Sequence, residues 1–372
     1  MEAYCLGIDA HKDNLTLSLT DREGKEVWKR KTAGSRAGLR HAMEGLLRTI
    51  GGDTSVHAGV EASRSHFWVD EELQGYCHQG WIEQAGVVQS DLVDGIRKRG
   101  KKSDWRDANE IADLMRCGRA RWVYMPPEPY ATLRLLSRDR LLKVHKTTRC
   151  QNRMWGILAR HGIQWPWRNL LGIRSRKQLS SVPVRAAEAQ EIGHLMEEIE
   201  LLERQVRTVE EGIGNQLKKI PEAQLLLEIP GMGQILVAMI LGEIGDLRRF
   251  RNGHEAAAFT GVVPRSLESG GVQRGVGITH RGNRILRTAL VSAAMMVSRY
   301  CLPFRENFKR RSRRLKKYKA RMANTRSLIM SLHAMVVRNE RFKYLPAEPK
   351  TSPSRHPSGV RAARRKQSIA TR

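Results

Sequence analysis

The sequence lacks the features that mark membrane and secreted proteins. It contains no run of about eighteen apolar residues, so we expect no membrane span and no membrane partner. Its opening letters, MEAYCLGIDAHKD, show neither the basic nor the apolar segment of a secretory signal. Five cysteines are scattered through the chain without a CxxC pair, which argues against a zinc knuckle or a disulfide framework. We therefore expect a reducing, cytoplasmic location.

Acidic residues are scarce relative to basic ones. Asp and Glu number 38 against 66 Lys and Arg, so the formal net charge is +28 and the isoelectric point is near 10.6. An excess this large favours a polyanionic partner over a merely solvated basic surface. We expect nucleic-acid binding that weakens with salt, with a slope of about −0.9 for each duplex phosphate neutralised. Charge alone does not distinguish DNA from RNA.

The first third of the chain predicts an α/β domain over residues 1–129. Residues 4–20 form two apolar strands, and further strands are expected at 25–32, 55–62 and 81–88, with helices at 35–49, 66–79 and 104–118. Strands that alternate with helices in this way are typical of an α/β sheet. Pro126, Pro127 and Pro129 mark the end of the domain.

The remainder predicts helices. Residues 130–220 are nearly all helical in pattern, and the apolar spacing over 186–219 suits a short coiled coil or packing within the same chain. Residues 221–345 form a mainly α domain, in which the turn IPGMG is either a helix-hairpin-helix or an ordinary helical corner. A basic tail, 346–372, is expected to be disordered unless it binds a partner.

Four carboxylates are candidates for a metal site. Asp9 lies in an apolar strand, Glu61 ends another strand, and Asp104 and Asp107 open a helix. Two carboxylates about 4 Å apart repel by roughly 4 kcal/mol at an effective dielectric of 20, and a divalent cation removes that penalty. Mg²⁺ or Mn²⁺ would suit these oxygens. Alternatively, Asp104 caps the helix, Asp107 complements its dipole, and Asp9 caps a turn before His11.

Basic residues cluster near glycine and serine. We interpret the segment 259–283, which is rich in Gly, Ser and Arg, as a loop. Two of its serines, Ser266 and Ser269, are candidate nucleophiles. Between 305 and 321 nearly every second residue is basic, on an expected helix. The side chains that we expect to bind nucleic-acid phosphates are Lys101, Lys102, Arg265, Arg274, Arg281, Arg284, Arg310, Arg311 and Arg314.

Several motifs in order resemble one family. GIDAHKD, GVEAS and KKSDWRDANEIADL resemble the first domain of the insertion sequence 110 (IS110) family of DEDD transposases. EIPGMGQILVAMILGEIGD, FTGVVPRSLESGG and GITHRGNRILRTAL resemble its C-terminal transposase domain. The resemblance runs from about residue 4 to about residue 300. It implies a RuvC-like RNase H fold whose Asp, Glu, Asp, Asp set maps onto the four carboxylates. Ser103 and Trp105 depart mildly from the family wording KTDxxDA.

The resemblance also implies a serine nucleophile from the second domain. Ser269 precedes Gly270 and Gly271 and matches the SG of the family, so we favour it over Ser266. A phosphoserine bond would keep the phosphodiester energy for rejoining strands. Further implied partners are element-end and target DNA, a structured noncoding guide RNA, and other copies of the chain in a dimer or tetramer. The location would be the bacterial or archaeal cytoplasm, at the nucleoid.

Two other functions fit the same residues. A metal-dependent Holliday-junction nuclease would use the carboxylates to activate water and leave the serine without a role. A non-catalytic nucleic-acid-binding protein would need only the basic surface. Persistence of all four acids and of the SGG sequence disfavours the second alternative.

Overall fold

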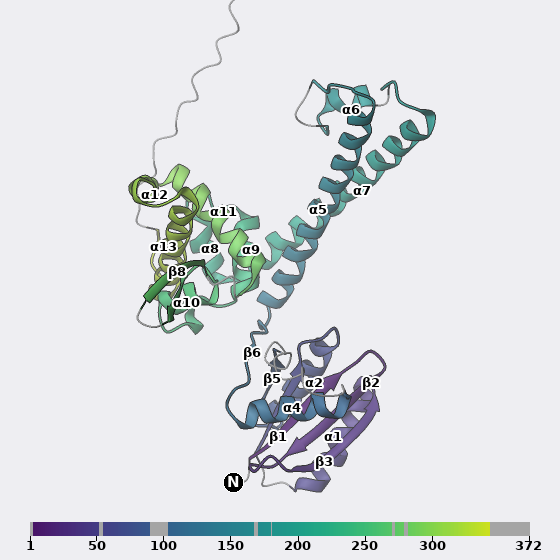
Figure 1. Ribbon diagram of the computed structural model, residues 1–372, viewed down its shortest axis with the longest axis vertical. Coiled ribbons are helices and arrows are strands. Elements are labelled where there is room, and N and C mark those ends of the chain that lie inside the picture. The colour runs from purple at the N-terminus through teal and green to yellow at the C-terminus, as the bar shows by residue number, and fades with distance from the viewer. Residues whose placement is uncertain are drawn as a thin grey trace, which may run out of the picture. The chain divides into compact units, whose positions relative to one another are not determined.

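The chain folds into two compact units, Met1–Met125 and Pro126–Arg372, in a computed structural model (Figure 1). The structure describes residues 3–51, 55–89, 103–166, 170–179, 181–269, 272–278 and 282–342. Only the backbone is described for 264–269 and 272–278. The finer division into domains 1–129, 130–220, 221–345 and 346–372 stays a prediction, and the tail lies outside the described residues.

The first unit is built on a six-stranded mixed sheet in the order β3-β2-β1-β4-β5-β6. Neighbours β1, β2 and β3 run antiparallel, whereas β4 and β5 run parallel to β1, and β6 pairs antiparallel with β5. This arrangement is compatible with the expected RNase H-like fold. The strands are β1 (Ala3–Ala10), β2 (Asn14–Thr20), β3 (Glu26–Ala33), β4 (Ser55–Glu61), β5 (Gln84–Val88) and β6 (Trp122–Val123).

In the described part of this unit, three helices accompany the sheet: α1 (Arg36–Ile50), α2 (His66–His78) and α4 (Asp104–Arg116). The apolar residues of α1, spaced by three and four, are buried with those of β1, β2 and β4 in one core. The predicted strands and helices of this unit are confirmed within a few residues. The two-residue strand β6 was not foreseen, because it is too short to show an alternating pattern.

Helix α4 lies against β1 at very short range. A Cβ atom built on Gly7 would meet the carbonyl oxygen of Ala108 at 1.9 Å and the backbone nitrogen of Ala112 at 2.7 Å. Only glycine allows a helix backbone to approach a strand backbone so closely. This contact sets α4 beside β1, the strand that carries Asp9.

The second unit begins with a long antiparallel pair, α5 (Tyr130–Arg160) and α7 (Ala186–Leu217), with α6 (Ile173–Leu179) at its far end (Figure 1). Buried residues of α5, including Met154 and Ile157, form one core with Ile192 and Ile199 of α7. The apolar face of α7 therefore packs within its own chain, which was one of the two expectations. The described positions of 161–172 and 181–185 contain no helix, because the chain reverses there.

A helical body completes this unit around a second large core. The segment 259–283, expected as a loop, instead contains the antiparallel hairpin of β7 and β8. The basic run at 305–321 is divided between α12 and α13, since the chain turns at Leu315 and packs α13 against α11. The elements are α8 (Pro221–Leu227), α9 (Gln234–Ile244), the 3-10 helix η3 (Leu247–Arg249), α10 (Gly253–Phe259), β7 (Pro264–Ser269), β8 (Val272–Ile278), α11 (Arg284–Tyr300), α12 (Leu302–Arg314) and α13 (Lys317–Arg338).

One buried carboxylate joins three helices of this body. Glu243 on α9 accepts hydrogen bonds from Arg138 of α5 at 2.7 and 2.8 Å. Its Oε2 also accepts a hydrogen bond from the side-chain amide of Asn283, the N-cap residue of α11. Asn283 in turn accepts hydrogen bonds from the backbone nitrogens of Ile285 and Leu286.

Among the described helices, none is long and apolar enough to cross a membrane.

Candidate active site

Asp9 is a buried carboxylate near the end of β1, with 2% of its surface exposed. Its neighbour Ile8 pairs with Val60 on the parallel strand β4. The next residue of β4 is Glu61, so the two acids come at corresponding ends of adjacent parallel strands. This is the adjacency that the sequence predicts for them.

Helix α4 brings the other two acids to the same strand. Its N-cap is Ser103, whose hydroxyl accepts a hydrogen bond from the backbone nitrogen of Arg106 at 3.3 Å. The alternative in which Asp104 caps the helix is therefore wrong, because the preceding serine already takes that place. Asp104 and the buried Asp107 lie one helical turn apart in the first turn. Their carboxylates are thus available for contacts beyond the helix end.

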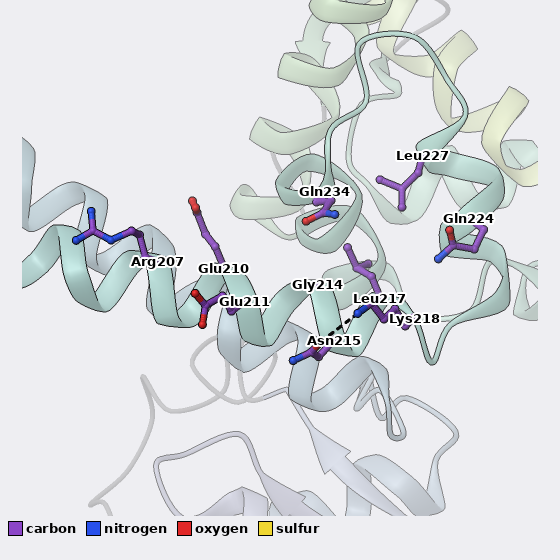
Figure 2. A pocket seen from close by; sticks show the side chains of 10 residues that line it. All are labelled: Arg207, Glu210, Glu211, Gly214, Asn215, Leu217, Lys218, Gln224, Leu227 and Gln234. Atoms are coloured by element: carbon purple, nitrogen blue, oxygen red, sulfur yellow. Dashed lines mark hydrogen bonds between the residues drawn. The ribbon is translucent and has the colours of Figure 1, made fainter.

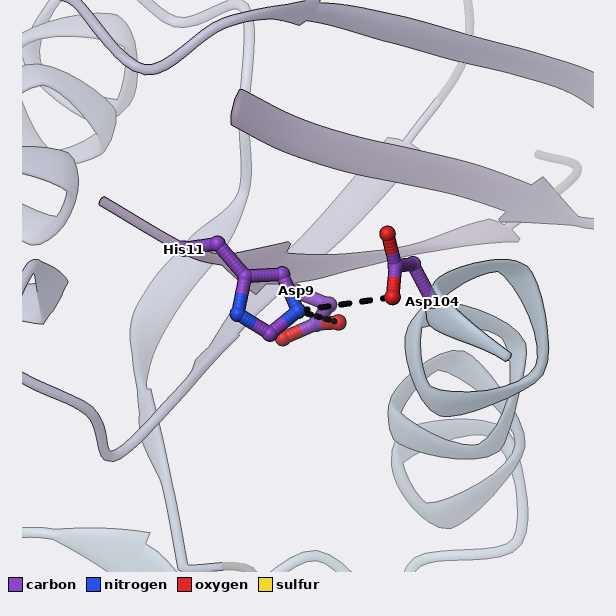
Figure 3. A group of neighbouring side chains, drawn as sticks. All are labelled: Asp9, His11 and Asp104. Atoms are coloured by element: carbon purple, nitrogen blue, oxygen red, sulfur yellow. Dashed lines mark ion pairs between the residues drawn. The ribbon is translucent and has the colours of Figure 1, made fainter. Parts of the chain in front are cut away.

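A histidine lies between two of these carboxylates (Figure 3). The Nε2 atom of His11 is 3.0 Å from Oδ2 of Asp9 and 3.6 Å from Oδ1 of Asp104. The ligand atoms of the three residues all lie within 4.8 Å of one another. We did not include His11 among the predicted site residues. The available signal was its position two residues after Asp9, just beyond the end of β1.

Lys31 fixes the second oxygen of Asp104. The ammonium group, on β3, donates a hydrogen bond to Oδ2 at 2.8 Å. This hydrogen bond is the main reason that the pKa of Asp104 is lowered below its ordinary value. Asp104 is therefore ionised at neutral pH and presents its Oδ1 atom toward His11.

Burial and three nearby carboxylates act together on Asp9. Burial is the largest effect and raises the pKa of Asp9 to about 6, although the charge of His11 opposes it. The charges of Glu61, Asp107 and Asp104 also contribute to this raised pKa. All four predicted acids are thus close enough to interact electrostatically, and they gather around the end of β1.

The cluster suits a divalent cation. The Oδ2 atom of Asp9 is buried and, although the His11 ring nitrogen lies 3.0 Å away, makes no hydrogen bond of acceptable geometry, so its desolvation cost is only partly offset. Carboxylate oxygens are the ligands that Mg²⁺ and Mn²⁺ prefer, and a cation would relieve the repulsion among the acids. Asp9 and Asp104 would hold such an ion, with Glu61 and Asp107 beside them.

The candidate serines lie on the β7–β8 hairpin of the second unit. Ser269 is the last residue of β7 and pairs with Val272, whereas Ser266 pairs with Gly275 farther along the hairpin. Two of the predicted arginines, Arg265 and Arg274, are on the same two strands. The residues Gly270, Gly271, Arg281, Lys101 and Lys102 lie outside the described part of the chain.

Comparisons with known proteins match both units. The protein-family model for DEDD transposases of the IS110 type, whose description is 'Transposase', matches residues 6–163. A second model, described as transposase IS116/IS110/IS902 family, matches residues 223–312. The chain belongs to the IS110 family of transposases. The resemblance inferred from short motifs is thereby confirmed.

Curated relatives of this transposase come from several bacteria. It is 28% identical to a probable family 20 transposase of Pseudomonas aeruginosa over 301 residues, covering 80% of this chain and 84% of that protein. It is 27% identical over 311 residues to the transposase for insertion sequence element IS1111A of Coxiella burnetii, covering 79% and 78%. A pilin gene-inverting protein of Moraxella bovis is 28% identical over 182 residues, covering 47% and 54%. These matches identify an insertion-sequence transposase that recombines DNA.

The basic residues of the transposase differ in their surroundings. Arg284, the first residue of α11, is exposed, as are Arg310 and Arg314 on α12. Arg311 instead turns inward and donates hydrogen bonds to Asn324 at 3.1 Å and Ser327 at 2.9 Å. Arg311 therefore fastens α12 to α13, whereas its neighbours are accessible to phosphate groups.

A hollow of about 730 Å³ lies beside the IPGMG turn of the transposase, between α7, α8 and α9 (Figure 2). Its lining combines Arg207 and Lys218 with Glu210 and Glu211. Opposite charges in equal number do not select an anionic ligand. The hollow therefore gives no support to phosphate binding at this turn.

Proposed function

We propose that this transposase cleaves and rejoins DNA with a divalent cation, Mg²⁺ or Mn²⁺, at Asp9, Glu61, Asp104 and Asp107. The nucleophile in this proposal is Ser269. The observation that carries it is the buried carboxylate of Asp9, whose Oδ2 atom makes no hydrogen bond of acceptable geometry and which lies close to the charges of the other three acids. A RuvC-like variant of the RNase H fold would place these groups against a DNA strand.

The proposed reaction transfers a phosphoryl group without hydrolysis. The Ser269 Oγ forms a bond to phosphorus while the bond from phosphorus to one strand's oxygen breaks, and the serine proton leaves to solvent or a nearby base. A bound divalent cation would offset charge that develops on the phosphate oxygens. Attack by a hydroxyl of another strand then reforms a phosphodiester and restores the serine. Exposed arginines such as Arg284 would contact phosphate oxygens during these steps.

The proposed partners are element-end DNA, target DNA and a structured noncoding guide RNA. A net charge of +28 supports binding of this much polyanion. We also propose a dimer or tetramer formed through the α5–α7 pair. On α5, Leu135 and Leu142 are 63% and 60% exposed and lie seven residues apart, which is the spacing of a helical seam. The site of action would be the nucleoid in the cytoplasm.

Trapping the covalent intermediate tests this proposal. The full-length protein is incubated with labelled element-end DNA, its co-purified RNA and Mg²⁺, and the products are separated on a denaturing gel. We expect a protein–DNA species whose label maps to the peptide containing Ser269. Ser269→Ala should abolish it, and the matched variant Ser266→Ala should retain it.

The same experiment separates the alternative activities. Asp9→Asn should abolish cleavage while nucleic-acid binding persists. Cleavage that survives in Ser269→Ala and never yields a covalent species would instead establish a water-activating nuclease of the Holliday-junction type. Unchanged cleavage in Asp9→Asn would refute the metal site, and binding without any cleavage would indicate a non-catalytic protein.

A further inference from the structure

We propose that His11 supplies a nitrogen ligand to the cation that Asp9 and Asp104 would hold, and thereby shifts the preference of the site from Mg²⁺ toward Mn²⁺. This inference rests on the proposed metal site and adds a residue outside the four acids. Its basis is the placement of one ring nitrogen, Nε2, between two carboxylate oxygens (Figure 3).

The distances among these atoms suit a shared ion. In an octahedral site with bonds of about 2.1 Å, adjacent ligand atoms are about 3 Å apart. The Nε2 atom of His11 lies 3.0 Å from Oδ2 of Asp9 and 3.6 Å from Oδ1 of Asp104. The two separations from Nε2 are therefore close to those expected around a single small cation, and the carboxylate oxygens of Asp9 and Asp104 lie within 4.8 Å of each other.

The two closest atoms lack other partners. Oδ2 of Asp9 and Nε2 of His11 are both buried, and neither takes part in a hydrogen bond of acceptable geometry. The side chain of Asp9 is 3% exposed, so water does not satisfy its oxygen from outside. A cation between these atoms would satisfy both at once, which an isolated ion pair of this geometry does not.

The surrounding structure holds the ligands in place. The backbone nitrogen of His11 donates a hydrogen bond to the carbonyl of Asn14 at 3.0 Å, which closes the turn between β1 and β2. The hydroxyl of Ser65 donates to the carbonyl of His11 at 3.4 Å. Lys31 orients Asp104 from the other side. Supporting contacts of this kind set the direction of metal ligands and raise metal affinity.

A nitrogen ligand has consequences for the choice of ion. Mg²⁺ takes almost only oxygen ligands, whereas imidazole nitrogen suits transition-metal ions, of which Mn²⁺ also accepts carboxylate and water. A purely carboxylate site would bind both ions through the same atoms. The competing description is that protonated His11 pairs with the carboxylates only while metal is absent, and leaves when an ion binds.

Pulsed electron paramagnetic resonance of Mn²⁺ bound to the full-length protein distinguishes the two descriptions. We expect the electron-spin-echo envelope to show coupling to ¹⁴N, and this coupling to change to that of ¹⁵N when histidine is labelled with ¹⁵N. His11→Ser should remove it. The matched control is His57→Ser, because His57 is also partly buried in this unit, with Nε2 3.5 Å from a carboxylate oxygen of Glu83. That variant should keep the coupling.

Calorimetric titration with Mn²⁺ and Mg²⁺ gives a second readout. His11→Ser should weaken Mn²⁺ binding by about tenfold or more, within the range for lost metal-site contacts, and change Mg²⁺ binding much less. Equal affinity changes for both ions, or tighter binding in His11→Ser, would overturn the inference. So would Mn²⁺ that binds through Asp9 without any nitrogen coupling. If the unaltered protein bound no Mn²⁺, or Asp9→Asn bound it equally well, the proposed metal site itself would fail.

Discussion

Arg138 on α5 grips the buried carboxylate of Glu243 on α9 through two parallel hydrogen bonds of 2.7 and 2.8 Å. The Glu243 side chain has no exposed surface, so its charge depends on this partner, on Arg134 at 3.5 Å and on Asn283. A buried charge that loses its partner is strongly destabilising, because desolvation is no longer offset. The long α5–α7 pair is therefore joined to the helical body by a polar contact as well as by packing.

The first prediction concerns this pair. Arg138→Ala should lower the free energy of unfolding of the second unit by up to about 3–5 kcal/mol, since it removes the closer of the two arginines that pair with the buried Glu243. Arg138→Ala combined with Glu243→Gln should recover part of the loss. The measurement is urea denaturation followed by circular dichroism. Additive losses in the double variant would show that the two side chains are not coupled.

A second prediction tests the close approach of α4 to β1. Gly7→Ala should destabilise the first unit by about 1–3 kcal/mol or more, because the added Cβ meets the Ala108 carbonyl at 1.9 Å. Mn²⁺ binding should weaken as α4 is displaced from Asp9. Gly75→Ala, in α2 with no atom within 4 Å of the added Cβ, should instead stabilise by up to about 1 kcal/mol. Denaturation and metal titration of both variants would check this contrast.

The third prediction concerns pH. Burial raises the pKa of Asp70 above its ordinary value, although a hydrogen bond from Gln74 opposes the shift. Because the folded state disfavours the ionised form, stability is lost as pH rises from the unfolded-state pKa, about 3.9, through the raised folded-state pKa. Asp70→Asn should therefore gain stability relative to the unaltered protein between about pH 4 and pH 7.

The control for Asp70 is an exposed acid of the same unit. Asp13→Asn removes an exposed carboxyl of the same unit and so controls for the loss of one negative charge. Thermal unfolding at several pH values, in the presence of a metal chelator, provides the comparison. A constant difference for Asp70→Asn would mean that the buried carboxyl titrates alike in both states.

The fourth prediction separates two neighbouring arginines of α12. Arg310→Ala should weaken DNA binding and reduce the slope of log affinity against log salt by about 1, as for one lost phosphate contact. Arg311→Ala should mainly lower stability, because Arg311 bonds to Asn324 and Ser327. Fluorescence anisotropy over a range of salt concentrations, with thermal unfolding of each variant, would distinguish these effects. Identical salt slopes for Arg310→Ala and the unaltered protein would contradict the assignment.

The sequence predicts the positions of the four acids better than it predicts the residues that contact them. Short apolar stretches locate β1 and β4, and the parallel pairing of these adjacent strands then explains why Asp9 and Glu61 come near each other. The capping residue was misjudged because Ser103 and Asp104 are both good caps and stand side by side. Side chains that arrive from another strand, such as Lys31 of β3, leave no local pattern that indicates their contact with Asp104.

The second unit shows where periodicity fails. Its long helices were predicted because apolar residues recur every three or four positions over many turns. The β7–β8 hairpin was taken for a loop because β7 is mostly polar and two glycines and an arginine interrupt the alternation in β8. The two strands are held together by pairing of their backbones, which the pattern of side chains does not indicate.

The contact between Asn283 and Glu243 connects the chain that follows the β7–β8 hairpin to the core of the helical body. Strand β8 leads within five residues to Asn283, whose amide both starts α11 and bonds to the carboxylate gripped by α5. Twisting α5 about its axis would pull on that carboxylate and disturb the first turn of α11. The first turn of α11, which follows β8 in the chain, is therefore linked through Glu243 to the long helix α5.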